Sequence, residues 1–140
     1  NIWVDGEPGE IVRAIRPLFT DLPEPAAFTI WYSMGPLREL PDMAFSLQSE
    51  AYVATYLVSN VADNDQRNRQ WLNQAMASAQ TVTIGQYLGD SDMTNRQLKF
   101  MADDNFARLQ QVISRFDPEG RFVRYLAHDN SKVNQNHWQL

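Results

Sequence analysis

The sequence contains no cysteine, only two lysines among its twelve basic residues, and only two histidines. Without cysteine, disulfides, thiolate nucleophiles and cysteine metal sites are excluded. No apolar run approaches the roughly 20 residues that a bilayer-spanning helix needs. Neither an Asn-x-Ser/Thr sequon nor a signal-peptide pattern is present. The compartment, cytoplasmic or secreted, is therefore left open, and no membrane-spanning segment is predicted.

Positive charge is sparse as well. The formal net charge is -5, and the basic residues form no stripe or cluster along the chain. This balance disfavours nucleic acid and anionic membranes as partners. A length of 140 residues with 44% hydrophobic side chains predicts one domain with a real core. Because the first residue is Asn, we expect a piece of a longer polypeptide.

Hydrophobic periodicity predicts helices and strands in alternation. An apolar stripe from Ile11 to Phe19 indicates a helix that starts at Pro8 and that Pro17 is expected to limit. Strands are expected over 26–35, 51–60 and 81–88, and further helices over 64–80 and 104–116, the last one stopped by Asp117-Pro118. This order predicts an α+β fold, a mostly antiparallel sheet with helices packed on one face. The domain is expected over 1–126, followed by an irregular tail over 127–140.

The residues alone suggest a few candidate sites and leave alternatives open. Tyr87 is either a cleft phenol or a core or rim tyrosine. The strand aromatics Trp31, Tyr32, Tyr52 and Tyr56 either line a flat pocket or pack between sheet and helices. The acidic residues Asp90, Asp92, Asp103 and Asp104 favour helix capping and solvation over a cation site. The histidines, His128 and His137, are expected to be solvated tail residues, so no metal site is predicted.

Three segments, in order, resemble one family. They are "PDMAFSLQSEAYVATYLVSN" (41–60), "TIGQYLGDSDM" (83–93) and "DDNFARLQQVISRFDPEGRF" (103–122). Together they resemble the C-terminal part of the substrate domain of berberine-bridge-enzyme-like FAD-linked oxidases, which have the vanillyl-alcohol-oxidase fold. The last segment carries the most specific match, with Asn105, Arg108, Leu109, Asp117, Pro118, Gly120 and Phe122 in the family's spacing.

The resemblance implies an FAD-dependent oxidoreductase that transfers a hydride from a substrate carbon to the flavin. FAD would be held by an N-terminal domain of the same protein, absent from this sequence, and this segment alone would be inactive. The catalytic positions implied are Tyr87 and Asp90, the cofactor-binding positions Asn105 and Tyr125, and the substrate-pocket positions Trp31, Tyr52 and Tyr56. The sequence departs from the family at Gly89, where Asn is usual, at Asp90, where a second Tyr is common, and after Phe122.

These departures keep a second hypothesis open, a non-catalytic domain of the same fold that binds a small ligand or forms a homodimer. A third, an unrelated small α+β-barrel dimer enzyme, has no catalytic constellation in the sequence. The resemblance favours a small-molecule substrate and the FAD-binding domain as partners. Bound flavin in the parent protein would separate the first hypothesis from the others.

Overall fold

The computed structural model describes residues 1–44, 47, 49–91 and 98–122. Its strands are β1 (Ile2–Val4), β2 (Phe28–Ser33), β3 (Ala51–Tyr56) and β4 (Thr83–Gly85). Its helices are α1 (Pro8–Thr20), α2 (Asp65–Ser78) and α3 (Asp103–Phe116), with 3-10 turns η1 (Ala62–Asn64), η2 (Gln80–Val82) and η3 (Leu88–Asp90). None of the helices in these ranges is long and apolar enough to cross a membrane.

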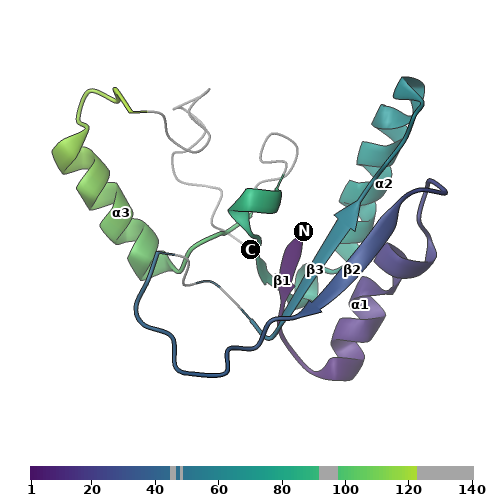
Figure 1. Cartoon of the computed structure of the whole chain (residues 1–140), viewed down its shortest axis with the longest axis horizontal. Helices are drawn as coiled ribbons and strands as arrows, with labels where there is room; N and C mark the ends of the chain where they lie inside the picture. Colours follow the sequence, from purple (N-terminus) through teal and green to yellow (C-terminus); the bar gives the residue numbers. More distant parts are fainter. Residues whose placement is uncertain (45–46, 48, 92–97, 123–140) are drawn as a thin grey trace.

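The strands form one open antiparallel sheet in the order β2-β3-β1-β4 (Figure 1). The predicted α+β class is confirmed, and β3 is central, as its apolar sequence indicated. β1 is a strand that the periodicity did not predict. The expected strand over 81–88 is shorter, because the Gln86 N–H turns away from β1 and donates to the Lys99 carbonyl at 2.7 Å.

Strand alternation divides the sheet into a covered face and an open face. Ile2, Val4 and Val53 point toward α1 and α2, where they are at most 1% exposed. The two helices lie side by side on this face (Figure 1) and contribute Ile15, Leu18 and Met76 to the core. Full burial of each large aliphatic side chain contributes about 1.5–3 kcal/mol. This core fixes the position of the opposite face.

The expectation that Pro17 limits helix α1 is wrong. The helix continues through Pro17 to Thr20, and the Pro17 carbonyl accepts the Asp21 N–H at 3.2 Å. Proline removes one backbone donor from the helix, but Leu18, directly after it, is completely buried against the sheet. Tertiary burial of that last turn therefore outweighs the lost hydrogen bond.

Helix α3 lies across the molecule from α1 and α2 (Figure 1). Its first turns pack Phe106 and Leu109 against a small cluster of Leu88, Phe100 and Met101. Farther along the helix, Val112 is 48% exposed and Phe116 67% exposed. The predicted helix is confirmed, and α1 and α2 are the helices that pack on the covered face of the sheet.

The end of α3 has the predicted stop. Asp117 follows the last helical residue, and its carboxylate accepts the backbone N–H of Arg121 at 2.6 Å and of Phe122 at 3.3 Å. Gly120 has φ 66°, a left-handed conformation that glycine adopts without strain. The buried Asp117 therefore closes the turn. The expected tail over 127–140, with both histidines, lies outside the described residues.

Candidate functional site

The open face of the sheet is aromatic. Tyr52 is at its centre, with its ring centroid 4.9 Å from that of Trp3 and 5.7 Å from that of Tyr32. Phe28 stacks on Tyr56 at 5.0 Å along the same face. These residues share the face because positions two and four apart on a strand point the same way. Aromatic pairs of this kind add about 0.5–1.5 kcal/mol beyond their buried area, so the rings form a firm floor.

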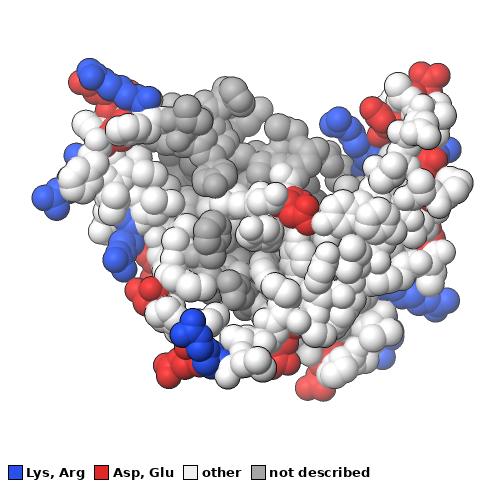
Figure 2. All heavy atoms as spheres, in the orientation of Figure 1, with Lys and Arg blue, Asp and Glu red and all other residues white. Residues whose placement is uncertain are grey.

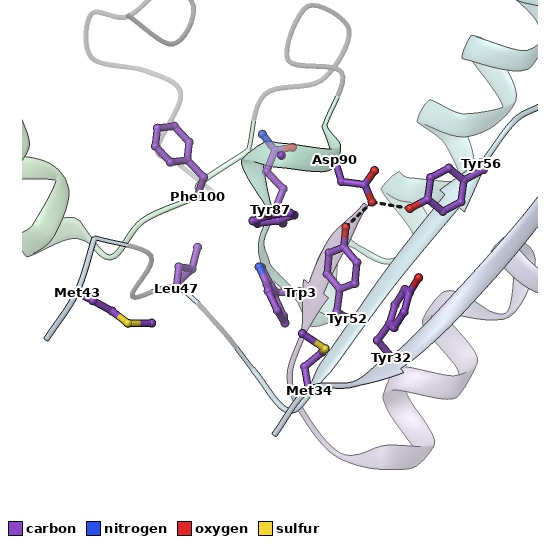
Figure 3. A pocket seen from close by; sticks show the side chains of 12 residues that line it. Trp3, Tyr32, Met34, Met43, Leu47, Tyr52, Tyr56, Tyr87, Asp90 and Phe100 are labelled. Carbon is purple, nitrogen blue, oxygen red and sulfur yellow. Dashed lines mark hydrogen bonds between the residues drawn. The ribbon is translucent and has the colours of Figure 1, made fainter. Parts of the chain in front are cut away.

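A pocket of about 650 Å³ lies over this floor, within the range of small-molecule sites. Figure 3 shows Tyr87 beside Trp3, and Met43, Leu47 and Phe100 on the opposite side of the pocket. The space-filling view shows charged side chains gathered near the outer parts of the molecule, with a mostly uncharged surface between them (Figure 2). The described lining consists of Trp3, Tyr32, Met34, Met43, Leu47, Tyr52, Tyr56, Gln86, Tyr87, Gly89, Asp90 and Phe100.

Asp90 is the charged residue of this described lining, and two phenols hold its carboxylate. The hydroxyls of Tyr52 and Tyr56 both donate to Oδ2, at 2.9 and 2.7 Å (Figure 3). Burial raises the pKa of Tyr52 well above its ordinary value, and the Asp90 hydrogen bond raises it further. The hydrogen bond to Asp90 is the main cause that raises the pKa of Tyr56 to about 12. Both phenols are therefore protonated donors at neutral pH.

The turn that carries Asp90 is held by the side chain of Asn1. Its Nδ2 donates to the carbonyls of Tyr87 at 3.2 Å and Asp90 at 2.6 Å, and to the Ser91 hydroxyl at 2.8 Å. Its Oδ1 accepts the Tyr87 N–H at 2.8 Å. A Cβ at Gly89 would lie 2.9 Å from the Tyr87 ring, so glycine lets that ring fold over the turn. One amide thus fixes the place of both Tyr87 and Asp90.

The structure brings four of the sequence-predicted site residues together and leaves Trp31 apart. Tyr52, Tyr56, Tyr87 and Asp90 all line the pocket. Trp31 is on the other face of β2, where its Nε1 donates to the Ser33 hydroxyl at 3.3 Å and its side chain is 41% exposed. Side chains alternate between the two faces along a strand, so Trp31, directly before Tyr32, points to the opposite face.

Of the two predicted cofactor positions, the structure describes Asn105, which is not in the described lining of the pocket. Asn105 is on the first turn of α3, where Nδ2 donates to Asp42 Oδ1 and to the Met43 carbonyl, both at 2.9 Å. Arg108 pairs with the same Asp42 at 3.3 Å. Asn105 therefore anchors the loop that presents Met43 to the pocket. Tyr125 lies outside the described residues.

Sequence reasoning missed three residues that build the site: Trp3, Gln86 and Asn1. Trp3 is on the unpredicted strand β1, and the β-branched and aromatic triplet Ile-Trp-Val before Asp5-Gly6 was its available signal. Gln86 is 1% exposed, and its Nε2 donates to the Leu98 carbonyl at 3.2 Å. No local pattern marks a terminal asparagine as a clamp for a turn more than 80 residues away.

The acidic residues do not assemble into a cation site in the part of the chain that the structure describes. No three His, Asp or Glu side chains converge there. Asp103 pairs with Lys99 at 2.8 Å. Asp103 and Asp104 both lie in the first turn of α3, where carboxylates interact favourably with the helix dipole. Asp92 lies outside the described residues.

The pocket fits a flat ring but not a whole flavin dinucleotide. A diphosphate needs backbone N–H groups at a helix N-terminus or basic side chains. The described lining contains no Arg or Lys and one carboxylate. The described lining of this pocket therefore offers no basic group for a diphosphate.

Most of the chain is similar to fungal FAD-linked oxidoreductases. It is 31% identical over 116 residues to FAD-linked oxidoreductase janO of Penicillium janthinellum, which covers 80% of this chain and 26% of that protein. It is 28% identical over 118 residues to nodO of Hypoxylon pulicicidum, 82% of this chain and 26% of that protein. The chain thus spans about a quarter of the length of these relatives. No protein-family model and no solved structure matches it.

Proposed function

We propose that this chain is the substrate-side portion of an FAD-linked oxidoreductase, with the C-terminal substrate segment of the berberine-bridge-enzyme-like oxidases as its nearest architecture. The similarity to FAD-linked oxidoreductases over four fifths of the chain carries the proposal. The aromatic pocket on the open sheet face supports it. Because the described lining of this pocket contains no Arg or Lys for a diphosphate, we expect another part of the same protein to bind the cofactor, with this chain covering the flavin and the substrate.

In such an enzyme the flavin supplies the hydride acceptor, and the residues of this chain bind and orient the substrate. The rings of Trp3, Tyr52 and Tyr87 offer apolar surface to a substrate body. Asp90 is the candidate base, since an ionised carboxylate accepts a hydroxyl or ammonium proton. The two phenol donors hold Oδ2 in place. The phenols themselves are poor bases, because their raised pKa values keep the protons on oxygen.

The test uses the natural gene product that contains this chain. We expect the purified protein to show flavin absorption bands that a substrate bleaches without oxygen. Replacing the base, Asp90→Asn, should slow that reduction about a hundredfold or more, whereas Asp104→Asn on α3 should leave the rate unchanged. A gene product without flavin would refute the oxidoreductase proposal and favour a ligand-binding domain. Flavin reduced at an unchanged rate in Asp90→Asn would refute the role of Asp90 alone.

A further inference from the structure

The pocket has two chemically different ends. At one end, Tyr52 and Tyr56 converge on Asp90; at the other, Met43, Leu47 and Phe100 face the aromatic floor (Figure 3). A molecule that fills about 650 Å³ must therefore be apolar over most of its length and polar at one place.

The polar end accepts hydrogen bonds and has little to donate. Oδ2 of Asp90 already receives both phenol protons, so Tyr52 and Tyr56 are occupied as donors. Within the described residues, no side chain or backbone N–H donates to Oδ1 of Asp90. Asp90 lines the pocket, and a carboxylate in such a place selects a ligand with an O–H or N–H donor. A ligand anion at this place would meet a like charge, and the described lining contains no Arg or Lys to compensate it.

The apolar end excludes ligands with many polar groups. A carbohydrate needs a hydrogen-bond partner for nearly every hydroxyl that it buries. Apart from the phenols, the Trp3 indole N–H and Asp90, the described lining offers one further polar side chain, Gln86, whose Nε2 already donates to Leu98. The rings of Tyr52 and Tyr87 meet edge to face at 6.4 Å, and Trp3 tilts against Tyr52 at 4.9 Å. Such surfaces suit a flat aromatic or polycyclic body.

We infer that the pocket binds a flat, mainly apolar aromatic or polycyclic molecule that donates one hydrogen bond, from a hydroxyl or an ammonium group, to the carboxylate of Asp90. The inference rests on the proposed function in naming this molecule as the substrate of the same site. The binding chemistry itself does not depend on the flavin, so it can be tested without turnover.

The experiment compares three probes of one shape on the chain itself. Naphthylmethanol carries a hydroxyl donor, naphthylmethylamine carries an ammonium donor at neutral pH, and the methyl ether of naphthylmethanol keeps the oxygen but has no donor. Protein-observed NMR titration follows the assigned indole N–H of Trp3, which lines the pocket. We expect at least one donor probe to bind about tenfold more tightly than the ether, as expected for a hydrogen bond to a charged acceptor.

Variants assign the preference to the carboxylate. Asp90→Asn should reduce the preference for the donor probes, because the charge is lost, while Asp104→Asn on α3 should keep it. If Asp90→Asn does not fold, Asp90→Ser removes the carboxylate with a smaller side chain and should reduce the preference in the same way. An ammonium probe that binds tenfold more tightly than the alcohol would identify an amine ligand, and equal or tighter binding of the alcohol would identify a hydroxyl ligand.

Three results would overturn the inference: equal affinity for the ether and both donor probes, an unchanged donor preference in Asp90→Asn, or no saturable shift with any probe. None of these concerns bound flavin. Loss of the donor preference in a protein that still carries reducible flavin would therefore leave the oxidoreductase proposal standing. A gene product without flavin that still prefers the donor probes would refute the oxidoreductase proposal and leave the binding inference standing.

Discussion

Removing the Asp90 carboxylate should lower the pKa of Tyr56, so that its phenol loses its proton at a lower pH. The hydrogen bond to Asp90 is the largest cause that raises the pKa of Tyr56 from 10.0 to about 12. Asp90→Ala removes that acceptor and its charge, so the pKa should return toward 10.0. At pH 11 the Tyr56 phenol would change from about one-tenth to about nine-tenths ionised. Tyr52 should remain raised, because burial is the first cause of its shift.

The assay reads phenolate absorbance in the near ultraviolet after a rapid jump from neutral pH to pH 11, before alkaline unfolding. The expected gain in Asp90→Ala over the unchanged chain is about four fifths of one phenolate. The same substitution in a Tyr56→Phe background should give almost no gain, and Asp104→Ala should give none. An equal gain with and without the Tyr56 hydroxyl would show that Asp90 does not hold that proton.

The hydrogen bond between Tyr56 and Asp90 also predicts how the free energy of unfolding changes with pH. A phenol whose pKa is raised on folding stabilises the native state below its unfolded pKa of 10.0, and that contribution is lost as pH rises through about 12. The free energy of unfolding of the unchanged chain should therefore fall more steeply between pH 10 and 12 than that of Asp90→Ala. A parallel pair of curves in urea titrations would contradict the assignment.

Two further substitutions test the scaffold. Leu18→Ala, at a completely buried position, should lower the free energy of unfolding in urea by about 2–5 kcal/mol. Val12→Ala, at a position 61% exposed on the same helix, should change that free energy by less than about 0.5 kcal/mol. Equal effects of the two substitutions would refute the assigned core. Gly85→Ala would place its Cβ against the Lys99 carbonyl and should lower the free energy of unfolding by about 1–3 kcal/mol. Gly9→Ala, with open space around it, should leave that free energy unchanged or raise it. No effect of Gly85→Ala would refute the close approach of Gly85 to Lys99.

The periodic elements were predictable because they obey a single local rule. The helix over 104–116 and the strand over 51–60 carry patterns strong enough to fix their type, and the structure confirms both. The stop at Asp117 was also readable, since the residue before proline leaves the helical region. Where a tertiary contact opposes a local rule, as burial of Leu18 opposes the helix-breaking tendency of Pro17, the sequence alone gave the wrong outcome.

The site was less predictable, because its residues come from segments far apart in the chain. Tyr52 and Tyr56 share a face by strand period, which the sequence indicates, but only the fold shows that this face is the open one. The three-residue strand β1 is too short for any periodicity, so Trp3 was missed. Trp31 is the converse case, since it is on β2 beside Tyr32 but points to the opposite face and is not in the described lining.

β3 links stability to the site, because successive residues serve opposite faces. Val53 is completely buried against the helices, while its neighbour Tyr52 is 7% exposed and forms the centre of the aromatic floor. A substitution at Tyr52 would remove packing against Trp3 as well as a donor to Asp90. Tyr56, at the end of the strand, keeps the same donor with less burial. Loss of function after changing Tyr52 therefore cannot separate unfolding from chemistry, whereas Tyr56→Phe removes one hydroxyl and leaves the floor in place.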